Sequence, residues 1–185
     1  MPGSSEIFDT EIGAFLSRTK GCFLDIGPGR GKMGRIARSS GCDPLYAIEI
    51  FPPYITEYNL DTLYESVGTG DACAIIDRPD MIFGTVMFGD VIEHMPKSSA
   101  MDLLEYLVIR CNWIIIKYPV NTKTSCLYQG SSLGNIYEGH ISIWSEADFD
   151  RFTLESFEQK ESMCLAIIKG YGGIGTPGKL VSEKP

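Results

Sequence analysis

The sequence has little positive charge and no long apolar segment. Its 185 residues include 24 acidic and 16 basic side chains, which gives a formal net charge of −8. Because binding to a phosphate backbone depends on Lys and Arg, this balance argues against nucleic acid as a partner. The longest apolar stretch, Met81 to Gly89, is about half the ~20 residues that a membrane span requires. We therefore expect neither nucleic acid nor a membrane as a partner.

The usual residue patterns of zinc sites, disulfide frameworks and signal peptides are also missing. The six cysteines lie far apart without a CxxC pair, and His94 and His140 are the only histidines. The N-terminal residues have neither the basic start nor the apolar stretch of a signal peptide. We expect reduced core thiols, no metal site and a cytoplasmic location.

What the sequence does contain is typical of one globular domain. Apolar residues make up 44% of the chain and charged residues 22%, which is enough to bury a core without a disulfide or metal. We expect a single domain over residues 1–185, consisting of a leading helix at 5–18, a core at 20–168 and a mobile glycine-rich tail at 169–185.

Predicted strands and helices alternate along the core. Strands are expected at 22–26, 45–50, 66–69, 82–89 and 113–116, and a closing hairpin is expected from 157–161 and 164–168. Helices are expected from about 32 to 41 and from 52 to 65. Two more should begin at capping boxes, Ser99 to Asp102 and Ser145 to Asp148. This order predicts a doubly wound α/β sheet with antiparallel strands at one edge.

The most informative segment is the glycine-rich turn that follows the first strand. It contains Gly27, Gly29 and Gly31, and such a turn lets the backbone approach a nucleotide-like ligand closely. A P-loop is excluded, because Met33 follows Lys32 where Ser or Thr is required. A dinucleotide site stays open, since Gly29 to Gly34 fits GxGxxG and Glu49 lies 20 residues beyond Gly29.

Three segments resemble the class I S-adenosylmethionine-dependent methyltransferases. Asp25 to Gly31 fits the pattern (D/E)xGxGxG, and Asp90 to Pro96 is similar to a D-V-x-E-H-x-P segment found after strand four in many small members. The stretch from His140 to Phe149 resembles H-x-S-x-W-S-x-x-D-F of the same subgroup. The resemblance covers about residues 20–168 and implies a seven-stranded sheet of order 3-2-1-4-5-7-6.

The resemblance also implies a cofactor and a set of residues that bind it. The cofactor is S-adenosyl-L-methionine, and the product is S-adenosyl-L-homocysteine. The glycine turn would contact the methionine part, Glu49 the ribose hydroxyls and Asp71 the adenine amine. The implied cofactor-binding residues are Asp25, Gly27, Pro28, Gly29, Gly31, Glu49, Ile50, Asp71, Ala72, Asp90 and Val91.

The two histidines are the candidate catalytic residues. Both His94 and His140 lie in segments that border the acceptor pocket in the related enzymes, and an imidazole can exchange a proton near neutral pH. With Glu93 they offer a metal-ligand set, but two adjacent residues and a remote one are a weak pattern, so we expect no metal. Tyr118, Tyr128 and Trp144 are further candidates for lining the acceptor pocket, or for packing.

Three functions remain open from the sequence. The first is methyl transfer to an oxygen or nitrogen atom of a small-molecule, saccharide or natural-product acceptor. The second is a non-catalytic protein of the same fold that binds the cofactor or a partner, and the third is an NAD-dependent oxidoreductase. Few residues precede the first strand, so the acceptor site is either open or completed by a second copy or a partner subunit. The long segment from Asn121 to Glu138 is expected to bind the acceptor.

Overall fold

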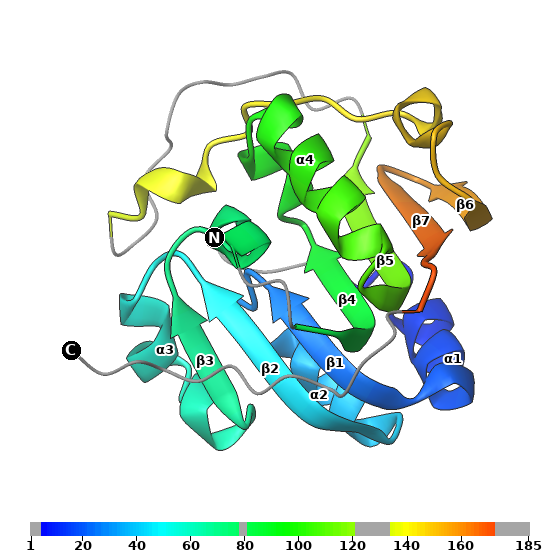
Figure 1. Cartoon of the computed structure of the whole chain (residues 1–185). Helices are drawn as coiled ribbons and strands as arrows, with labels where there is room; N and C mark the ends of the chain where they lie inside the picture. Colours follow the sequence, from blue (N-terminus) through cyan, green and yellow to red (C-terminus); the bar gives the residue numbers. More distant parts are fainter. Residues whose placement is uncertain (1–4, 78–80, 121–133, 173–185) are drawn as a thin grey trace.

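A seven-stranded sheet runs through the molecule (Figure 1). The computed structural model describes residues 5–77, 81–120 and 134–172. The strand order is β3-β2-β1-β4-β5-β7-β6. The strands are β1 (Gly21–Ile26), β2 (Cys42–Glu49), β3 (Ser66–Thr69), β4 (Phe83–Gly89), β5 (Cys111–Pro119), β6 (Leu154–Lys160) and β7 (Met163–Lys169). β1 to β5 are parallel, and β7 is antiparallel to both β5 and β6. This confirms the predicted fold class and strand order.

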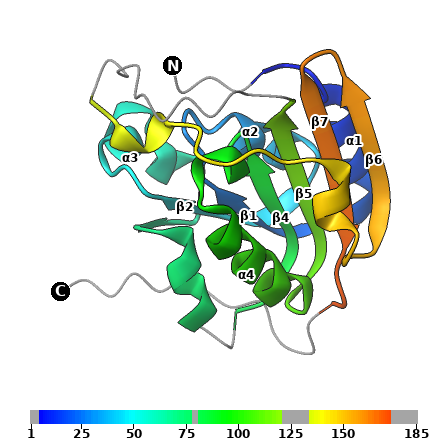
Figure 2. The ribbon, with the colours of Figure 1, turned by 90° about the horizontal axis from the view of Figure 1, so that it is seen from above.

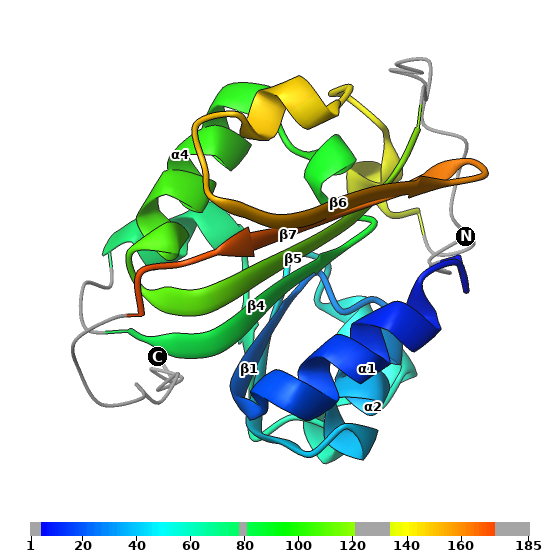
Figure 3. The same ribbon diagram turned by 90° about the vertical axis from the view of Figure 1, so that its right-hand side faces the viewer.

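Helices cover both faces of the sheet. The α-helices are α1 (Asp9–Thr19), α2 (Lys32–Ser39), α3 (Pro53–Glu57) and α4 (Lys97–Val108). The short 3₁₀ helices are η1 (Leu60–Thr62), η2 (Ala72–Asp77), η3 (Ile92–His94), η4 (Ile136–Glu138) and η5 (Glu146–Phe149). Figure 3 shows α1 and α2 on one face and α4 with η5 on the other. Within the described ranges, no helix is both long and apolar enough to cross a membrane.

The core consists of two apolar layers, one on each side of the sheet. Side chains along a strand alternate between the faces, so Val86 and Phe88 of β4 pack with Leu104 of α4, while Met87 packs with Leu16 of α1. All five of these side chains are almost fully buried. A parallel strand covered on both faces must be apolar throughout, which explains the continuous apolar run of β4.

Several predicted boundaries were wrong for local reasons. The leading helix begins at Asp9 and not near residue 5, because Phe8 adopts a left-handed conformation with φ 73°. The helix predicted over 52–65 is divided into α3 and η1 by Asn59, which has φ 51°. The capping box at Ser99 is not a helix start, since α4 begins at Lys97 directly after the extended Pro96. Proline favours the beginning of a helix, so α4 starts directly after Pro96 and the capping box that begins at Ser99 is already inside the helix.

Other boundaries were confirmed. Ser145 and Asp148 form the predicted capping box, with both of its hydrogen bonds present. The closing hairpin forms as β6 and β7, each slightly longer than predicted. The predicted mobile tail falls mostly on residues 173–185, which lie outside the described residues.

A buried acid occupies the middle of the sheet. Asp25 of β1 is 1% exposed, and its Oδ2 accepts a hydrogen bond of 2.6 Å from the hydroxyl of Tyr64. Burial raises the pKa of Asp25 to about 7, although the Tyr64 hydrogen bond opposes the shift. The folded protein therefore holds a proton here that the unfolded chain releases above its ordinary pKa of 3.8.

We predict that Asp25→Asn removes a pH-dependent loss of stability. The folded state of the wild type keeps this proton up to a higher pH than the unfolded chain does. Its free energy of unfolding therefore falls as pH rises from the unfolded pKa of 3.8 to the folded pKa of about 7, by up to about 1.4 kcal/mol per pH unit. Urea unfolding at pH 5, 6, 7 and 8 should show the variant gaining relative to the wild type as pH rises. Asp61→Asn, at an exposed acid, serves as the control and should show no such gain. Parallel pH profiles for the wild type and Asp25→Asn would contradict the prediction.

A second prediction concerns the close approach of β4 to β1. A Cβ atom added to Gly84 would lie 2.8 Å from the backbone oxygen of Cys22, whereas one added to Gly68 would lie 3.8 Å from its nearest neighbours. Gly84→Ala should lower the free energy of unfolding by about 1–3 kcal/mol. Gly68→Ala should change it by less than about 0.5 kcal/mol. Equal effects in urea unfolding would show that β4 can shift away from β1.

Candidate active site

A cavity of about 700 Å³ opens at the carboxyl ends of the parallel strands. It lies where the strand order reverses, because β1 has β2 on one side and β4 on the other. Loops that leave β1 and β4 here diverge to opposite faces of the sheet, which creates a crevice at this point in doubly wound folds. The fold therefore places the cavity where the sequence predicted a ligand.

Most residues predicted to bind the cofactor line this cavity. They are Gly27, Pro28, Gly29, Glu49, Ile50, Asp71, Ala72, Asp90 and Val91. The other two predicted residues, Asp25 and Gly31, are not among the lining residues. Asp25 lies beneath the turn and bonds to Tyr64. Gly31, with φ 72°, is the N-cap of α2 and lies close to Leu60 and Leu63. Both residues therefore stabilise the turn and are not part of the cavity wall.

The glycine turn has a backbone that only glycine adopts readily. Gly27 and Gly29 have φ values of 63° and 50°, in the left-handed region. A Cβ atom on Gly27 would also lie 2.7 Å from Cγ2 of Val91. The turn therefore needs glycine both for its backbone conformation and for its contact with the loop after β4.

Glu49 ties the turn to the end of β2. Its Oε2 accepts a hydrogen bond of 3.2 Å from the backbone N–H of Gly29, and its Oε1 accepts one of 2.8 Å from Phe51. The side chain is 3% exposed, and burial raises its pKa while the two backbone hydrogen bonds oppose that shift. Asp71 follows β3 at the same edge of the sheet, and its Oδ1 accepts a hydrogen bond of 2.8 Å from the N–H of Cys73.

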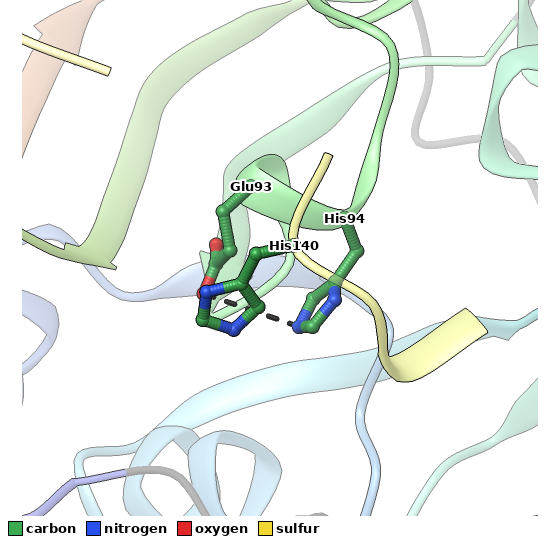
Figure 4. Close-up of side chains that lie close together, drawn as sticks. All are labelled: Glu93, His94 and His140. Carbon is green, nitrogen blue, oxygen red and sulfur yellow. Dashed lines mark ion pairs between the residues drawn. The ribbon is translucent and has the colours of Figure 1, made fainter. Parts of the chain in front are cut away.

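Across β1 from Glu49, three side chains come together on η3 and the loop before η5 (Figure 4). His94 Nε2 lies 4.0 Å from Glu93 Oε1, and the rings of His94 and His140 have centroids 4.7 Å apart. Burial lowers the pKa of both histidines. Burial, with the nearby charge of Asp90, raises the pKa of Glu93 to about 8. Both predicted catalytic residues thus line the cavity, as does Glu93.

Backbone hydrogen bonds bring residues 93 and 140 together. The backbone oxygen of Glu93 accepts hydrogen bonds from the N–H groups of Ile141 and Ser142, at 2.8 and 3.1 Å. The Ser142 hydroxyl donates to the backbone oxygen of Ile92 at 3.1 Å. In Figure 2 the chain from η4 to η5, in yellow, crosses from the side of α3 toward β6. These bonds fix that crossing segment to η3.

A buried lysine, Lys117, lies near the cavity and was not among the predicted site residues. Lys117 of β5 is fully buried, and its Nζ lies 3.4 Å from Asp90 Oδ2 and 3.8 Å from Asp9 Oδ1. Lys117 and Lys32 also donate to the backbone oxygen of Ser5, at 2.6 and 2.8 Å. Ser5 and Glu6 are thereby held at the wall of the cavity. The available signal was a lysine directly after the apolar run from Ile114 to Ile116.

The aromatic candidates have structural roles. Tyr118 is fully buried and does not line the cavity. Trp144 stacks on Phe149, and its Nε1 donates to the backbone oxygen of Ile92 at 3.1 Å. Tyr128 and most of the segment predicted to bind the acceptor, residues 121–133, lie outside the described residues.

Comparison with known proteins supports the fold. No protein-family model and no curated protein matches the sequence. Among solved structures, a SAM-dependent methyltransferase from Archaeoglobus fulgidus is 17% identical, with a TM-score of 0.65 over 90% of this chain and 95% of that one.

Two longer proteins also match. An O-methyltransferase family protein from Burkholderia thailandensis is 9% identical, with a TM-score of 0.63 over 95% of this chain and 57% of that one. The mitomycin 7-O-methyltransferase MmcR is 13% identical, with a TM-score of 0.59 over 89% of this chain and 54% of that one. The chain thus spans little more than half of each. Together with the sheet order, these likenesses show that the chain has the fold of the class I S-adenosylmethionine-dependent methyltransferases.

Proposed function

We propose that the protein binds S-adenosyl-L-methionine and transfers its methyl group to an oxygen or nitrogen atom of a small-molecule acceptor. The observation that carries the proposal is the position of Glu49, whose carboxylate is fixed beside the glycine turn by the N–H groups of Gly29 and Phe51. Similar structures are named as SAM-dependent methyltransferases and O-methyltransferases, which supports the same chemistry. A saccharide or a natural-product intermediate fits the proposed acceptor class.

The residues present fit this cofactor. A carboxylate has about four sites for accepting hydrogen bonds, and two at Glu49 are used by the backbone. The remaining capacity suits a pair of ribose hydroxyls, and bonds to an ionised acceptor are the stronger kind. Gly27 and Gly29 present backbone without side chains, which suits the methionine part. Asp71 and Ala72 also line the cavity and would border the adenine.

The protein's contribution to the reaction is mainly positioning. When bound, the cofactor supplies an electrophilic methyl group on a sulfonium sulfur. Holding two reactants in a productive geometry can contribute roughly 7–11 kcal/mol. The wall with Glu49 and the glycine turn would hold the cofactor, and the wall with His94 and His140 would bind and orient the acceptor. Ser5 and Glu6 would help to exclude water from the cavity they line.

Glu49→Gln should weaken binding of S-adenosyl-L-methionine and S-adenosyl-L-homocysteine at least 10-fold. An amide has one acceptor oxygen, so it cannot accept from both Gly29 and Phe51 and still receive hydroxyls. Calorimetric titration should give micromolar affinity for both cofactors in the wild type and none for NAD. Glu57→Gln, at an exposed acid of α3, should bind like the wild type. Binding of NAD alone would replace the proposal with a nicotinamide oxidoreductase, and unchanged affinity in Glu49→Gln would remove Glu49 from the site.

His94→Ala should distinguish the role of the acceptor wall from the role of the cofactor wall. We expect cofactor affinity within about 3-fold of the wild type and turnover at least 10-fold lower, because the change affects only the acceptor wall. The measurement is transfer of labelled methyl groups to a panel of hydroxyl and amine compounds. Unchanged turnover would give His94 a structural role. Cofactor binding without transfer to any member of the panel would favour the non-catalytic alternative.

A further inference from the structure

We propose that Glu93, His94 and His140 bind a divalent transition-metal ion at the acceptor wall of the cavity. Their potential ligand atoms all lie within 4.8 Å of one another. His140 is remote from Glu93 and His94 along the chain, which made the sequence pattern a weak one, and the folded geometry removes that objection. The metal's role in holding an acceptor rests on the proposed function, but metal binding itself does not.

The carboxylate of Glu93 is the first argument. Its side chain is 2% exposed, and neither carboxylate oxygen has a hydrogen-bond partner among the described residues. A buried polar group without a partner is costly and uncommon, so each instance needs an explanation. Lys117, the buried cation in this region, lies against Asp90 and Asp9. A metal ion bound between Glu93 and the two imidazoles would give this carboxylate its partner.

The orientation of His94 is the second argument. Its Nδ1 lies 3.1 Å from the backbone oxygen of Gly139. A carbonyl oxygen only accepts hydrogen bonds, so Nδ1 carries the hydrogen and the neutral ring keeps its lone pair on Nε2. Nε2 is the atom that faces Glu93, at 4.0 Å from Oε1. Metal-binding histidines are commonly oriented in this way, by a backbone carbonyl on the other ring nitrogen.

The backbone also holds the group together before any ion binds. Ile141 and Ser142 bond to the backbone oxygen of Glu93, which fixes His140 beside η3 (Figure 4). Ligand atoms bonded to one ion at about 2.0–2.2 Å lie roughly 3 Å apart. The ligand atoms here would therefore have to move by about 1–2 Å, through side-chain rotation, to complete the site.

The donor set indicates the class of ion. Two imidazole nitrogens and one carboxylate oxygen suit Zn²⁺, Co²⁺, Mn²⁺ or Fe²⁺ better than Ca²⁺, which prefers oxygen ligands only. Three protein ligands leave coordination positions open toward the cavity. Those positions suit an oxygen atom of an acceptor, so the proposal favours hydroxyl acceptors over amines. A bound cation would also lower the pKa of a hydroxyl that it holds.

The test is metal binding by the full chain, prepared without an affinity tag and freed of metal by a chelator. Titration with CoCl₂, followed by calorimetry and by visible absorption, should show one equivalent bound at micromolar affinity or tighter. ZnCl₂ should displace the cobalt spectrum. Glu93→Gln, His94→Ala and His140→Ala should each weaken Co²⁺ binding at least 10-fold. Glu146→Gln, at an exposed acid of η5, is the matched control and should bind like the wild type.

Circular dichroism would show whether each variant is folded. If a variant is unfolded, His140→Gln, at a partly exposed position, is tested in its place. Absence of saturable Co²⁺ binding in the wild type would overturn the inference, as would binding that all three substitutions leave unchanged. Titration with S-adenosyl-L-methionine on the same samples separates the two proposals. Intact cofactor binding without metal binding overturns only the metal site, and the reverse result overturns only the proposed function.

Discussion

The strand order reverses between β1 and β4, and this reversal positions each part of the candidate site. The chain leaves β1 through the glycine turn toward α2 on one face, and it leaves β4 through η3 toward α4 on the other. The two loops therefore separate above β1 and leave a crevice between them. Glu49 stands on one side of this crevice and Glu93 on the other, because β2 and β4 are the neighbours of β1.

Buried ionisable groups are concentrated around this edge of the sheet. Asp25, Glu49, Glu93 and Lys117 are each 3% exposed or less. Burying a charge is unfavourable unless it is paired or neutralised, and the four groups meet that requirement differently. Glu49 has backbone donors, Lys117 has two aspartates, and Asp25 has Tyr64. The Glu93 carboxylate has no hydrogen-bond partner among the described residues, which is why Glu93 is the most informative of the four.

The sequence allowed one side of the site to be predicted far better than the other. Glu49 and the glycine turn follow directly from strands one and two, so their places depend on local pattern and on a parallel sheet. The position of His140 depends on hydrogen bonds from Ile141 and Ser142 to Glu93, and no local pattern encodes them. Strand order came from the family resemblance, since periodicity does not determine which strands are neighbours. Predicted helix boundaries were wrong where the backbone conformation of a single residue ended or began a helix, as at Pro96 and Asn59.

The cavity wall includes residues from Ser5 to Met163, contributed by segments at both ends of the described core. A wall of this kind exists only in the folded chain, so a molecule that fits the cavity binds the native state and not the unfolded one. Such a ligand stabilises the native state by about 2.7 kcal/mol when present at 100 times its dissociation constant. The melting temperature of the protein is therefore a reporter of cavity occupancy, and acceptors can be sought by thermal shift before any turnover is seen.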